Sequence, residues 1–210
     1  MDLNLFSLYL ITPQQPPEII VDKTERALLY APPGRIAVQL RARHLPAAAL
    51  FVLGKRLRKL TRQANAKLLI NDRLDVAKLA QADGVQLPET GLSPRTARHI
   101  LGDRALIGRS CHDRKGLEHA AHEGADFATL SPLFTSPGKG TPLGERQFAR
   151  MAADRALPLV ALGGVSAANA GLARAAGASG VAVLRAVYAA ADPAIAVQQL
   201  LESFDAPLRA

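Results

Sequence analysis

Two neighbouring glycines are the clearest candidates for a phosphate site. Gly163 and Gly164 lie shortly before Ser166, where a helix is predicted to begin. Such a turn leaves backbone N–H groups open to an anion, and the N-terminal end of the helix adds a favourable dipole. The same residues also suit an ordinary tight turn, with positive φ at the glycines and Ser166 capping the helix. Taken alone, the glycines are compatible with both interpretations.

A second group of polar side chains begins within an apolar run at residues 36–40. Gln39, Arg41 and Arg43 are spaced two residues apart, so they share one side of the chain if the strand continues. Guanidinium groups bind a diphosphate through paired hydrogen bonds. The alternative is a strand end that runs out into a charged loop.

Asn71 and Asp72 follow another apolar run. The carboxylate of Asp72, helped by the Asn71 amide, would hold Mg²⁺ against a substrate diphosphate, since Mg²⁺ prefers oxygen ligands. Asp72 would equally well cap the helix that is predicted to follow it. A single carboxylate is a weak indication of a metal.

The segment 135–144 is long for a loop between a strand and a helix, and it contains Ser136, Gly138 and Lys139. Such a loop is able to close over a phosphorylated ligand, with Lys139 as a mobile point charge. An ordinary polar loop would have the same composition.

His112 stands between Cys111 and Asp113. Adjacent side chains point apart, which argues against a catalytic Cys–His pair here. Cys111 is the only cysteine, and this excludes an internal disulfide framework and a multi-cysteine metal site.

Short apolar runs alternate with helical patterns along the chain. Strands are expected at residues 6–11, 36–40, 68–71, 84–87, 105–108, 127–130, 159–162 and 180–184, and helices at 22–30, 47–64, 75–82, 94–101, 116–123, 145–153, 167–176 and 193–204. Strands that are apolar throughout indicate a parallel sheet buried on both faces. Eight repeats favour closure, so we expect an α/β fold: a single (β/α)8 TIM barrel over residues 1–210, with its site at the C-terminal ends of the strands.

The composition narrows the classes of partner. The formal net charge is +8, which suits nucleic acid, acidic membranes or anionic metabolites. Aromatic residues make up only 4% and there is no Trp, so a base-stacking surface is not expected. The basic run at residues 55–62 fits the solvated face of a helix. No membrane span or signal peptide is evident, and we expect small phosphorylated substrates and a cytoplasmic protein, with homo-oligomerisation left open.

These segments together resemble the thiamine-phosphate synthase/TenI family over nearly the whole chain. The similarity is carried by Gln-Leu-Arg at 39–41, Leu-Ile-Asn-Asp-Arg-Leu-Asp-Val-Ala at 69–77, Asp-Gly-Val-Gln-Leu at 83–87, Ile-Gly-Arg-Ser-Cys-His at 107–112, Ser-Pro-Leu-Phe at 131–134 and Leu-Gly-Gly-Val at 162–165. The synthase branch joins hydroxymethylpyrimidine diphosphate to a thiazole phosphate and releases pyrophosphate with Mg²⁺. The resemblance therefore implies a transferase of thiamine biosynthesis.

The resemblance also implies roles for individual residues. It assigns the pyrimidine diphosphate to Gln39, Arg41, Arg43, Asn71, Ser110 and Lys139, with Lys139 and Arg41 as catalytic residues and Lys139 stabilising the leaving diphosphate. It assigns Mg²⁺ to Asp72. The thiazole phosphate falls to Ser136, Gly138 and the backbone of Gly164, Leu184 and Arg185.

Some positions depart from the synthase pattern. Arg43 replaces a lysine, and Ser136 and Gly138 replace two threonines. Gly91 stands where the pattern has a second magnesium aspartate, which should weaken Mg²⁺ binding unless nearby Glu89 substitutes for it.

Two other segments, Gln-Leu-Pro at 86–88 and residues 108–112, resemble the TenI branch. That branch aromatises a thiazole carboxylate phosphate without a metal, using a histidine where this chain has Pro132. His112 is the nearest other acid–base group. The alternatives are therefore a TenI-type tautomerase and a non-catalytic regulator that binds thiazole phosphate or thiamine phosphate.

Overall fold

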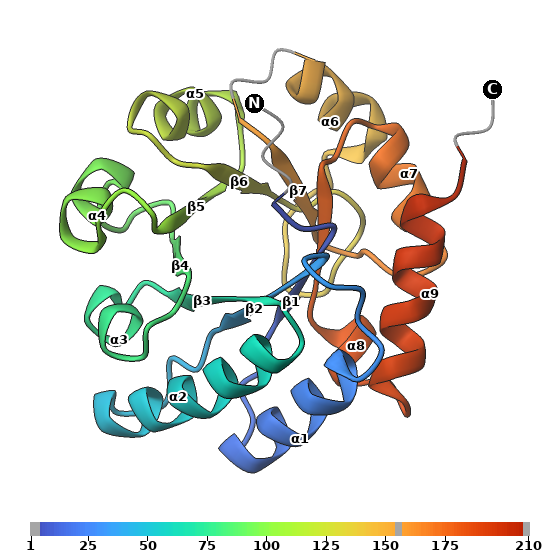
Figure 1. Cartoon of the computed structure of the whole chain (residues 1–210). Helices are drawn as coiled ribbons and strands as arrows, with labels where there is room; N and C mark the ends of the chain where they lie inside the picture. The colour runs from blue at the N-terminus through green and yellow to red at the C-terminus, as the bar shows by residue number, and fades with distance from the viewer. Residues whose placement is uncertain (1–4, 154–156, 208–210) are drawn as a thin grey trace.

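The protein forms a closed barrel of eight parallel strands in the order β1 to β8 (Figure 1). The computed structural model describes residues 5–153 and 157–207, so the other residues of the predicted single domain lie outside the described ones. The strands are β1 (Leu8–Ile11), β2 (Ile36–Leu40), β3 (Lys67–Asn71), β4 (Gly84–Leu87), β5 (Leu106–Cys111), β6 (Phe127–Leu130), β7 (Leu159–Leu162) and β8 (Gly180–Val183). β1 pairs with both β2 and β8, and this closes the barrel as predicted.

Helices surround the barrel on the outside (Figure 1). They are α1 (Pro17–Leu28), α2 (Ala47–Gln63), α3 (Leu74–Leu79), α4 (Pro94–Leu101), α5 (Arg114–His122), α6 (Gly144–Ala153), α7 (Ala170–Ala175), α8 (Arg185–Tyr188) and α9 (Pro193–Asp205). Among these described helices, none is long and apolar enough to cross a bilayer.

Several predicted bounds were wrong. α1 begins at Pro17 rather than at residue 22, because proline at the first helical position has the φ that a helix requires. β5 continues to Cys111, so Ser110 belongs to the strand instead of following it. The short helix α8 was not predicted, since four residues are too few to show a helical period.

Aromatic side chains form a layer inside the barrel toward the N-terminal ends of the strands, here called the lower layer. Phe6, Tyr9 and Phe127 are buried there, and the ring of Phe6 lies 5.0 Å from that of Tyr9 and 5.3 Å from that of Phe127. These aromatic side chains therefore fill this part of the barrel interior. Aliphatic side chains on the outward faces of the strands, such as Leu40 and Leu68, form a core with helix residues such as Leu53 and Leu57 of α2.

Partly buried ion pairs connect helices to the beginnings of strands. Asp126, just before β6, accepts hydrogen bonds from the N–H of Ile107 (2.7 Å) and from Arg98 of α4 (2.8 Å). Asp83 holds the corresponding place before β4 and accepts from Arg58 of α2 (2.6 Å). The predicted solvated face of α2 was thus partly wrong, because Arg58 is mostly buried and Arg56 is paired with α1.

We expect Asp126→Ala to lower the free energy of unfolding by about 2–3 kcal/mol, because Arg98 and the Ile107 N–H would lose their shared acceptor. Urea denaturation monitored by circular dichroism measures this. The control is Glu118→Ala, which removes an exposed pair with Arg114 and should cost less than about 0.5 kcal/mol. Equal losses in the two variants would show that Asp126 contributes no more than a surface charge.

Candidate active site

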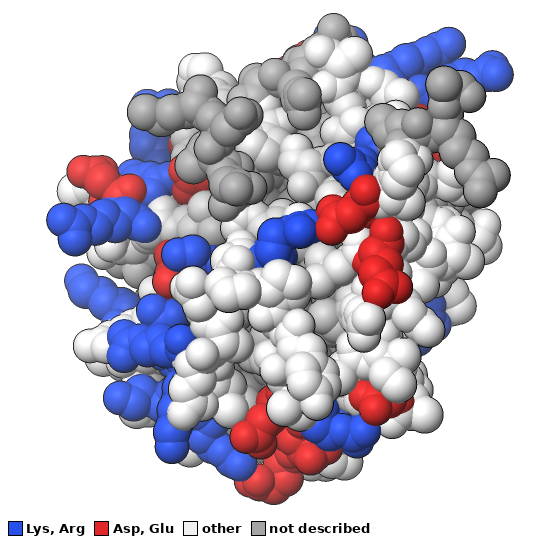
Figure 2. Space-filling view, turned by 45° about the vertical axis from the view of Figure 1, so that its right-hand side comes forward, with Lys and Arg blue, Asp and Glu red and all other residues white. Residues whose placement is uncertain are grey.

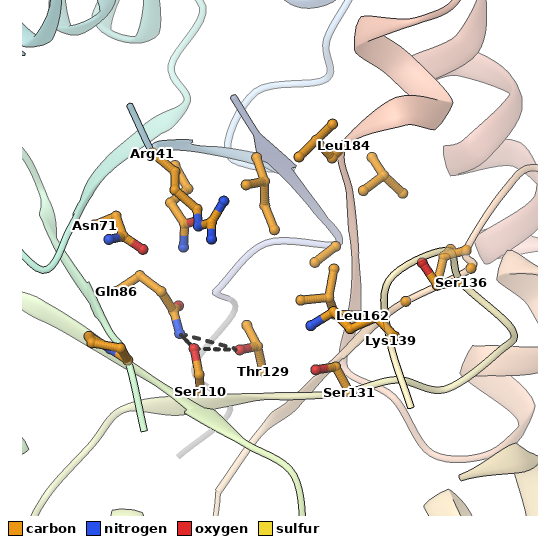
Figure 3. A pocket seen from close by; sticks show the side chains of 18 of the residues that line it. Arg41, Asn71, Gln86, Ser110, Thr129, Ser131, Ser136, Lys139, Leu162 and Leu184 are labelled. Atoms are coloured by element: carbon orange, nitrogen blue, oxygen red, sulfur yellow. Dashed lines mark hydrogen bonds between the residues drawn. The ribbon is translucent and has the colours of Figure 1, made fainter. Parts of the chain in front are cut away.

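A pocket of about 620 Å³ opens at the C-terminal ends of the strands, and residues from all eight strand ends line it (Figure 3). The residues predicted for the site and found in its lining are Gln39, Arg41, Arg43, Asn71, Ser110, Ser136, Lys139, Gly164, Leu184 and Arg185. Asp72 and Gly138 are not part of this lining. In Figure 3, Arg41 and Asn71 lie on the opposite side of the pocket from Ser136 and Leu184.

The floor of the pocket is polar and buried. Gln39, Gln86 and Thr129 point inward from β2, β4 and β6, and each is at most 3% exposed. Gln86 donates to Ser110 (3.2 Å) and to Thr129 (3.3 Å), as the dashed lines in Figure 3 show. The contribution of Gln86 and Thr129 was missed, although both occupy inward positions that the period of two identifies once the strand bounds are known.

Cationic side chains line the pocket without facing a carboxylate. Among the described residues, no ion pair engages Arg41, Arg43, Lys139 or Arg185. On the outer surface, by contrast, basic and acidic groups lie close together at several places (Figure 2). Burial lowers the pKa of Lys139, and the charge of Arg41 lowers it further. A bound anion would relieve both effects.

The Gly163–Gly164 turn is rigid. Both residues have positive φ (98° and 67°), and a Cβ at Gly164 would lie 2.4 Å from the carbonyl oxygen of Thr135. The predicted cap was wrong: α7 begins at Ala170 with Asn169 as its N-cap, and the Asn169 amide joins the Ser166 N–H to the Gly164 carbonyl. The turn is therefore not the N-terminal end of α7. The Ser136 hydroxyl and Arg185, 3.5 Å apart, also line the pocket.

Asp72 does not cap α3, since Arg73 is the N-cap residue and no side-chain cap bond is formed. The Asp72 carboxylate instead lies against Gly91: a Cβ there would be 3.2 Å from Oδ1. In the described part of the chain, no group of three or more His, Cys, Asp and Glu side chains is placed to hold a metal. With only the Asp72 carboxylate there, Mg²⁺ would need further oxygen ligands, such as substrate phosphates and water.

Glu89 turns away from Asp72. Its Oε2 lies 3.8 Å from His112 Nε2, and its Oε1 would lie 3.1 Å from a Cβ at Gly116 of α5. His112 Nδ1 is 2.7 Å from the Ser131 carbonyl oxygen, so that nitrogen carries a proton and Nε2 faces Glu89. Glu89 therefore belongs with His112 on the α5 side and does not replace the carboxylate that is absent at Gly91.

Cys111 has no nucleophilic role in this site. Its side chain is buried, and burial raises the pKa of the thiol to about 12 with a smaller contribution from Glu89. A thiol in that state is inert at neutral pH.

Comparison with known proteins gives a consistent result. The family model "Thiamine monophosphate synthase" matches residues 8–187. The chain belongs to the thiamine monophosphate synthase family. It is 43% identical over 204 residues to a putative thiamine-phosphate synthase of Geobacter sulfurreducens, covering 93% of each chain. It is 41% identical to a thiamine-phosphate synthase of Methanoculleus marisnigri, covering 84% of this chain and 85% of that one.

A solved structure of a thiamine phosphate pyrophosphorylase from Pyrococcus furiosus superposes with a TM-score of 0.87 and 29% identity, covering 98% of both chains. The thiamine monophosphate synthase family thus accounts for the barrel as a whole, as the sequence resemblance implied.

We expect diphosphate binding to take up protons at pH values just below the ordinary lysine pKa of about 10.4. The lowered pKa of Lys139 should rise when an anion neutralises its surroundings, so the bound form holds more protons in that range. Titration calorimetry with inorganic diphosphate, in buffers of different ionisation enthalpy, measures the uptake.

The matched variant is Lys139→Met, which keeps length but has no titratable group. Diphosphate itself titrates in this range, so the quantity of interest is the difference between wild type and variant. Identical proton uptake by the two proteins would show that Lys139 does not contact the anion.

Proposed function

We propose that this protein is a thiamine-phosphate synthase, which couples hydroxymethylpyrimidine diphosphate to a thiazole phosphate and releases pyrophosphate. One observation carries the proposal: cationic side chains and open backbone N–H groups lie on two sides of a single pocket. Arg41 and Arg43 lie on one side, and the Gly163–Gly164 turn and Arg185 lie on the other. Lys139 comes from the same loop as Ser136 and lies near it in Figure 3, close enough to Arg41 for the two charges to interact. Two anionic substrates can therefore bind in one cavity, and the names of the relatives agree with such a reaction.

The pyrimidine diphosphate belongs on the first side. Arg41, Arg43 and Lys139 would neutralise its phosphates, while Asn71 and the floor residues Gln39 and Ser110 would bind the ring. Arg41 already lowers the pKa of Lys139, so the two cations are near enough to act on one diphosphate.

The thiazole phosphate belongs on the second side. The backbone of Gly164, Leu184 and Arg185 would bind it, together with the Ser136 hydroxyl. Gly138 has no side chain and lies outside the lining, so the guanidinium of Arg185, near Ser136, would supply the contact that a hydroxyl at residue 138 cannot.

The reaction itself is a substitution at carbon. The C–O bond to the diphosphate breaks with its electron pair going to oxygen, and the thiazole nitrogen forms the new C–N bond. Lys139 and Arg41 would stabilise the charge that develops on the leaving group. Mg²⁺, held by Asp72 and by phosphate oxygens, would supply further charge neutralisation there.

A TenI-type tautomerase is the second candidate, because His112 is oriented by the Ser131 carbonyl and adjoins Glu89 at the pocket wall. A histidine held in this way can move a proton on a bound thiazole. It would take the place of the histidine that the tautomerase pattern has at Pro132.

The deciding experiment incubates the purified protein with both substrates, with and without Mg²⁺, and measures pyrophosphate and thiamine phosphate. We expect Mg²⁺-stimulated product, and Lys139→Ala should lower turnover by at least about 100-fold while changing the affinity for thiazole phosphate little. The absence of product, together with accelerated aromatisation of the thiazole carboxylate phosphate, would establish the tautomerase. Thermal stabilisation by thiazole phosphate with neither activity would indicate a binding protein.

The geometry at Gly91 predicts a way to strengthen the metal site. A side chain at Gly91 would begin next to Asp72 but would meet Pro88 Cγ at 2.8 Å and Cδ at 2.9 Å. The double variant Pro88→Ala/Gly91→Asp removes these two atoms and adds a second carboxylate. We expect it to lower the Mg²⁺ concentration for half-maximal activity by about tenfold or more.

Two single variants serve as controls for this test. Gly91→Asp alone should lower the thermal stability because its Cβ collides with the Pro88 ring. Pro88→Ala alone should leave the Mg²⁺ requirement unchanged. A double variant with the wild-type Mg²⁺ requirement would show that the metal does not lie at Asp72.

A further inference from the structure

Side chains of the loop between β1 and α1 hold the backbone of Arg41. The Thr12 hydroxyl accepts a hydrogen bond from the Arg41 N–H (2.8 Å), and Gln14 Nε2 donates to the Arg41 carbonyl oxygen (3.1 Å). Gln14 Oε1 in turn lies 2.7 Å from Nδ1 of His44, a residue of the loop after β2. We call Thr12, Gln14 and His44 the clamp, because together they engage both backbone polar groups of Arg41.

These bonds extend the ladder between β1 and β2 with side chains. The ladder includes a backbone bond from the Thr12 N–H to the Gln39 carbonyl oxygen (3.0 Å). In a regular parallel ladder, the next two bonds would run from the Arg41 N–H to the Thr12 carbonyl and from the Gln14 N–H to the Arg41 carbonyl. Here the side chains of Thr12 and Gln14 bond to the same two groups of Arg41 instead. Arg41 thus remains paired although both strands have ended.

The Gln14 amide can take only one orientation in the clamp. Its NH₂ donates to the Arg41 carbonyl, so its oxygen faces His44, and His44 Nδ1 is the donor of that bond. Turning the amide over would set its oxygen against the Arg41 carbonyl oxygen and lose the bond. His44 therefore acts on Arg41 through Gln14.

Arg41 needs this support because like charges surround it. Its side chain lies at the edge of the pocket (Figure 3), and in the described part of the chain no carboxylate forms an ion pair with it. Burial lowers the pKa of Arg41 and the charge of Arg43 lowers it further, while the pKa of Lys139 is lowered by burial and then by the charge of Arg41. Burial and repulsion both favour moving the guanidinium out into water. A backbone held at its N–H and its carbonyl opposes that movement.

The members of the clamp differ in burial. Thr12 is 0% exposed, whereas Gln14 and His44 are exposed to solvent. Removing the Thr12 hydroxyl would deprive the Arg41 N–H of its acceptor in a place that water does not reach, which costs more than losing a bond that water can replace. Thr12 should therefore contribute more than Gln14 and His44.

We propose that Thr12, Gln14 and His44 are positioning residues, which keep the guanidinium of Arg41 at the pocket against the repulsion of Arg43 and Lys139 and thereby raise the affinity for a diphosphate. The inference rests on the proposed function for the placement of the diphosphate at Arg41. It adds three residues that are not part of the pocket lining and that act on the ligand through Arg41.

The test measures the Kd of inorganic diphosphate by calorimetry at a fixed Mg²⁺ concentration, with the Kd of thiazole phosphate as an internal reference. Thr12→Val keeps the shape of the side chain and removes the acceptor. We expect it to weaken diphosphate binding by about tenfold and to change thiazole phosphate binding by less than about twofold, since that ligand is placed on the other side of the pocket. Thr12→Ser restores a hydroxyl and should restore most of the diphosphate affinity. Wild-type diphosphate affinity in Thr12→Val, or an equal loss for both ligands, would overturn the inference.

The exposed members of the clamp provide a second test. Gln14→Met removes both bonds of the amide, and His44→Leu removes the donor that orients it. Each should weaken diphosphate binding by about three- to fivefold, and the double variant should lose no more than Gln14→Met alone. His44→Asn places an amide nitrogen near the position of Nδ1 and should recover the loss. Additive losses in the double variant would contradict the role of His44, and wild-type affinity in Gln14→Met would overturn the inference even if Thr12→Val failed to fold.

Lys139 reports whether Arg41 has moved. In Thr12→Val, Arg41 should lie farther from Lys139, so the pKa of Lys139 should rise toward its usual value before the ligand binds. Proton uptake on diphosphate binding, measured just below the ordinary lysine pKa of about 10.4, should then be smaller than in wild type. Undiminished uptake alongside weaker binding would place the loss elsewhere than at Arg41 and count against the clamp.

Thr24→Val is the matched control. Thr24 is also 0% exposed, and its hydroxyl donates to the Ile20 carbonyl oxygen (2.6 Å) within α1 and contacts the Tyr188 hydroxyl. This variant should lose thermal stability much as Thr12→Val does and keep the diphosphate affinity of wild type. Loss of that affinity in Thr24→Val as well would show that general destabilisation causes both effects, and the clamp would be wrong.

The outcomes also separate the clamp from the proposed function. If wild type makes thiamine phosphate and Thr12→Val binds diphosphate as wild type does, the clamp is wrong and the synthase stands. If the clamp variants lose diphosphate affinity and wild type makes no product, the synthase is wrong and the clamp stands.

Discussion

The closed ladder of parallel strands is the constraint on which the rest of the structure depends. Because β1 pairs with both β2 and β8, all strands end at one rim and every second side chain points inward. Register then decides which inward residues meet: Asn71 lies opposite Gln86, and Ser110 opposite Thr129. The polar layer is therefore assembled from distant parts of the sequence by backbone hydrogen bonds alone.

The two interior layers depend on each other. The aromatic layer of Phe6, Tyr9 and Phe127 excludes water from below, which makes each hydrogen bond in the polar layer more important to satisfy. Gly108 provides the space that both layers need, since a Cβ there would meet Phe127 Cζ at 2.3 Å as well as Gln86. Packing in the lower layer thus limits the orientations available to the groups that face the ligand.

Cationic side chains at the pocket differ from those on the outer surface in how they are neutralised. The outer pairs, such as Arg35 with Asp205 at 2.8 Å, are already neutralised within the protein. Arg41 and Lys139 instead face each other at the pocket, and the pKa of both is lowered, chiefly by burial. This arrangement costs free energy in the empty protein and favours an anion, so part of the binding energy is the relief of repulsion.

The sequence predicted the eight strands and most of the residues that line the pocket, because strand ends are marked by changes in local composition. The polar run after residue 38 and the paired glycines are visible without any three-dimensional information. Gln86 was not recognised as a floor residue because its partners, Tyr9 and Ser110, come from strands β1 and β5, and only the register brings them together. The sequence also did not show which way the Glu89 side chain points. Its position depends on buried Arg109, which donates to the carbonyl oxygens of residues 89 and 92.

The glycine at residue 91 affects both the packing of its turn and the negative charge near Asp72. Gly91 N–H donates to the Pro88 carbonyl (3.0 Å) in a tight turn, and the Pro88 ring fills the space where a side chain at residue 91 would begin. The packing of this turn thus leaves no room for a second carboxylate beside Asp72 at residue 91. With less negative charge from the protein, the diphosphate of the proposed function would meet a more positive rim, and the arginines and Lys139 would take a larger share of its neutralisation. In the proposed reaction, side chains would then neutralise more of the diphosphate charge than a tightly held ion would.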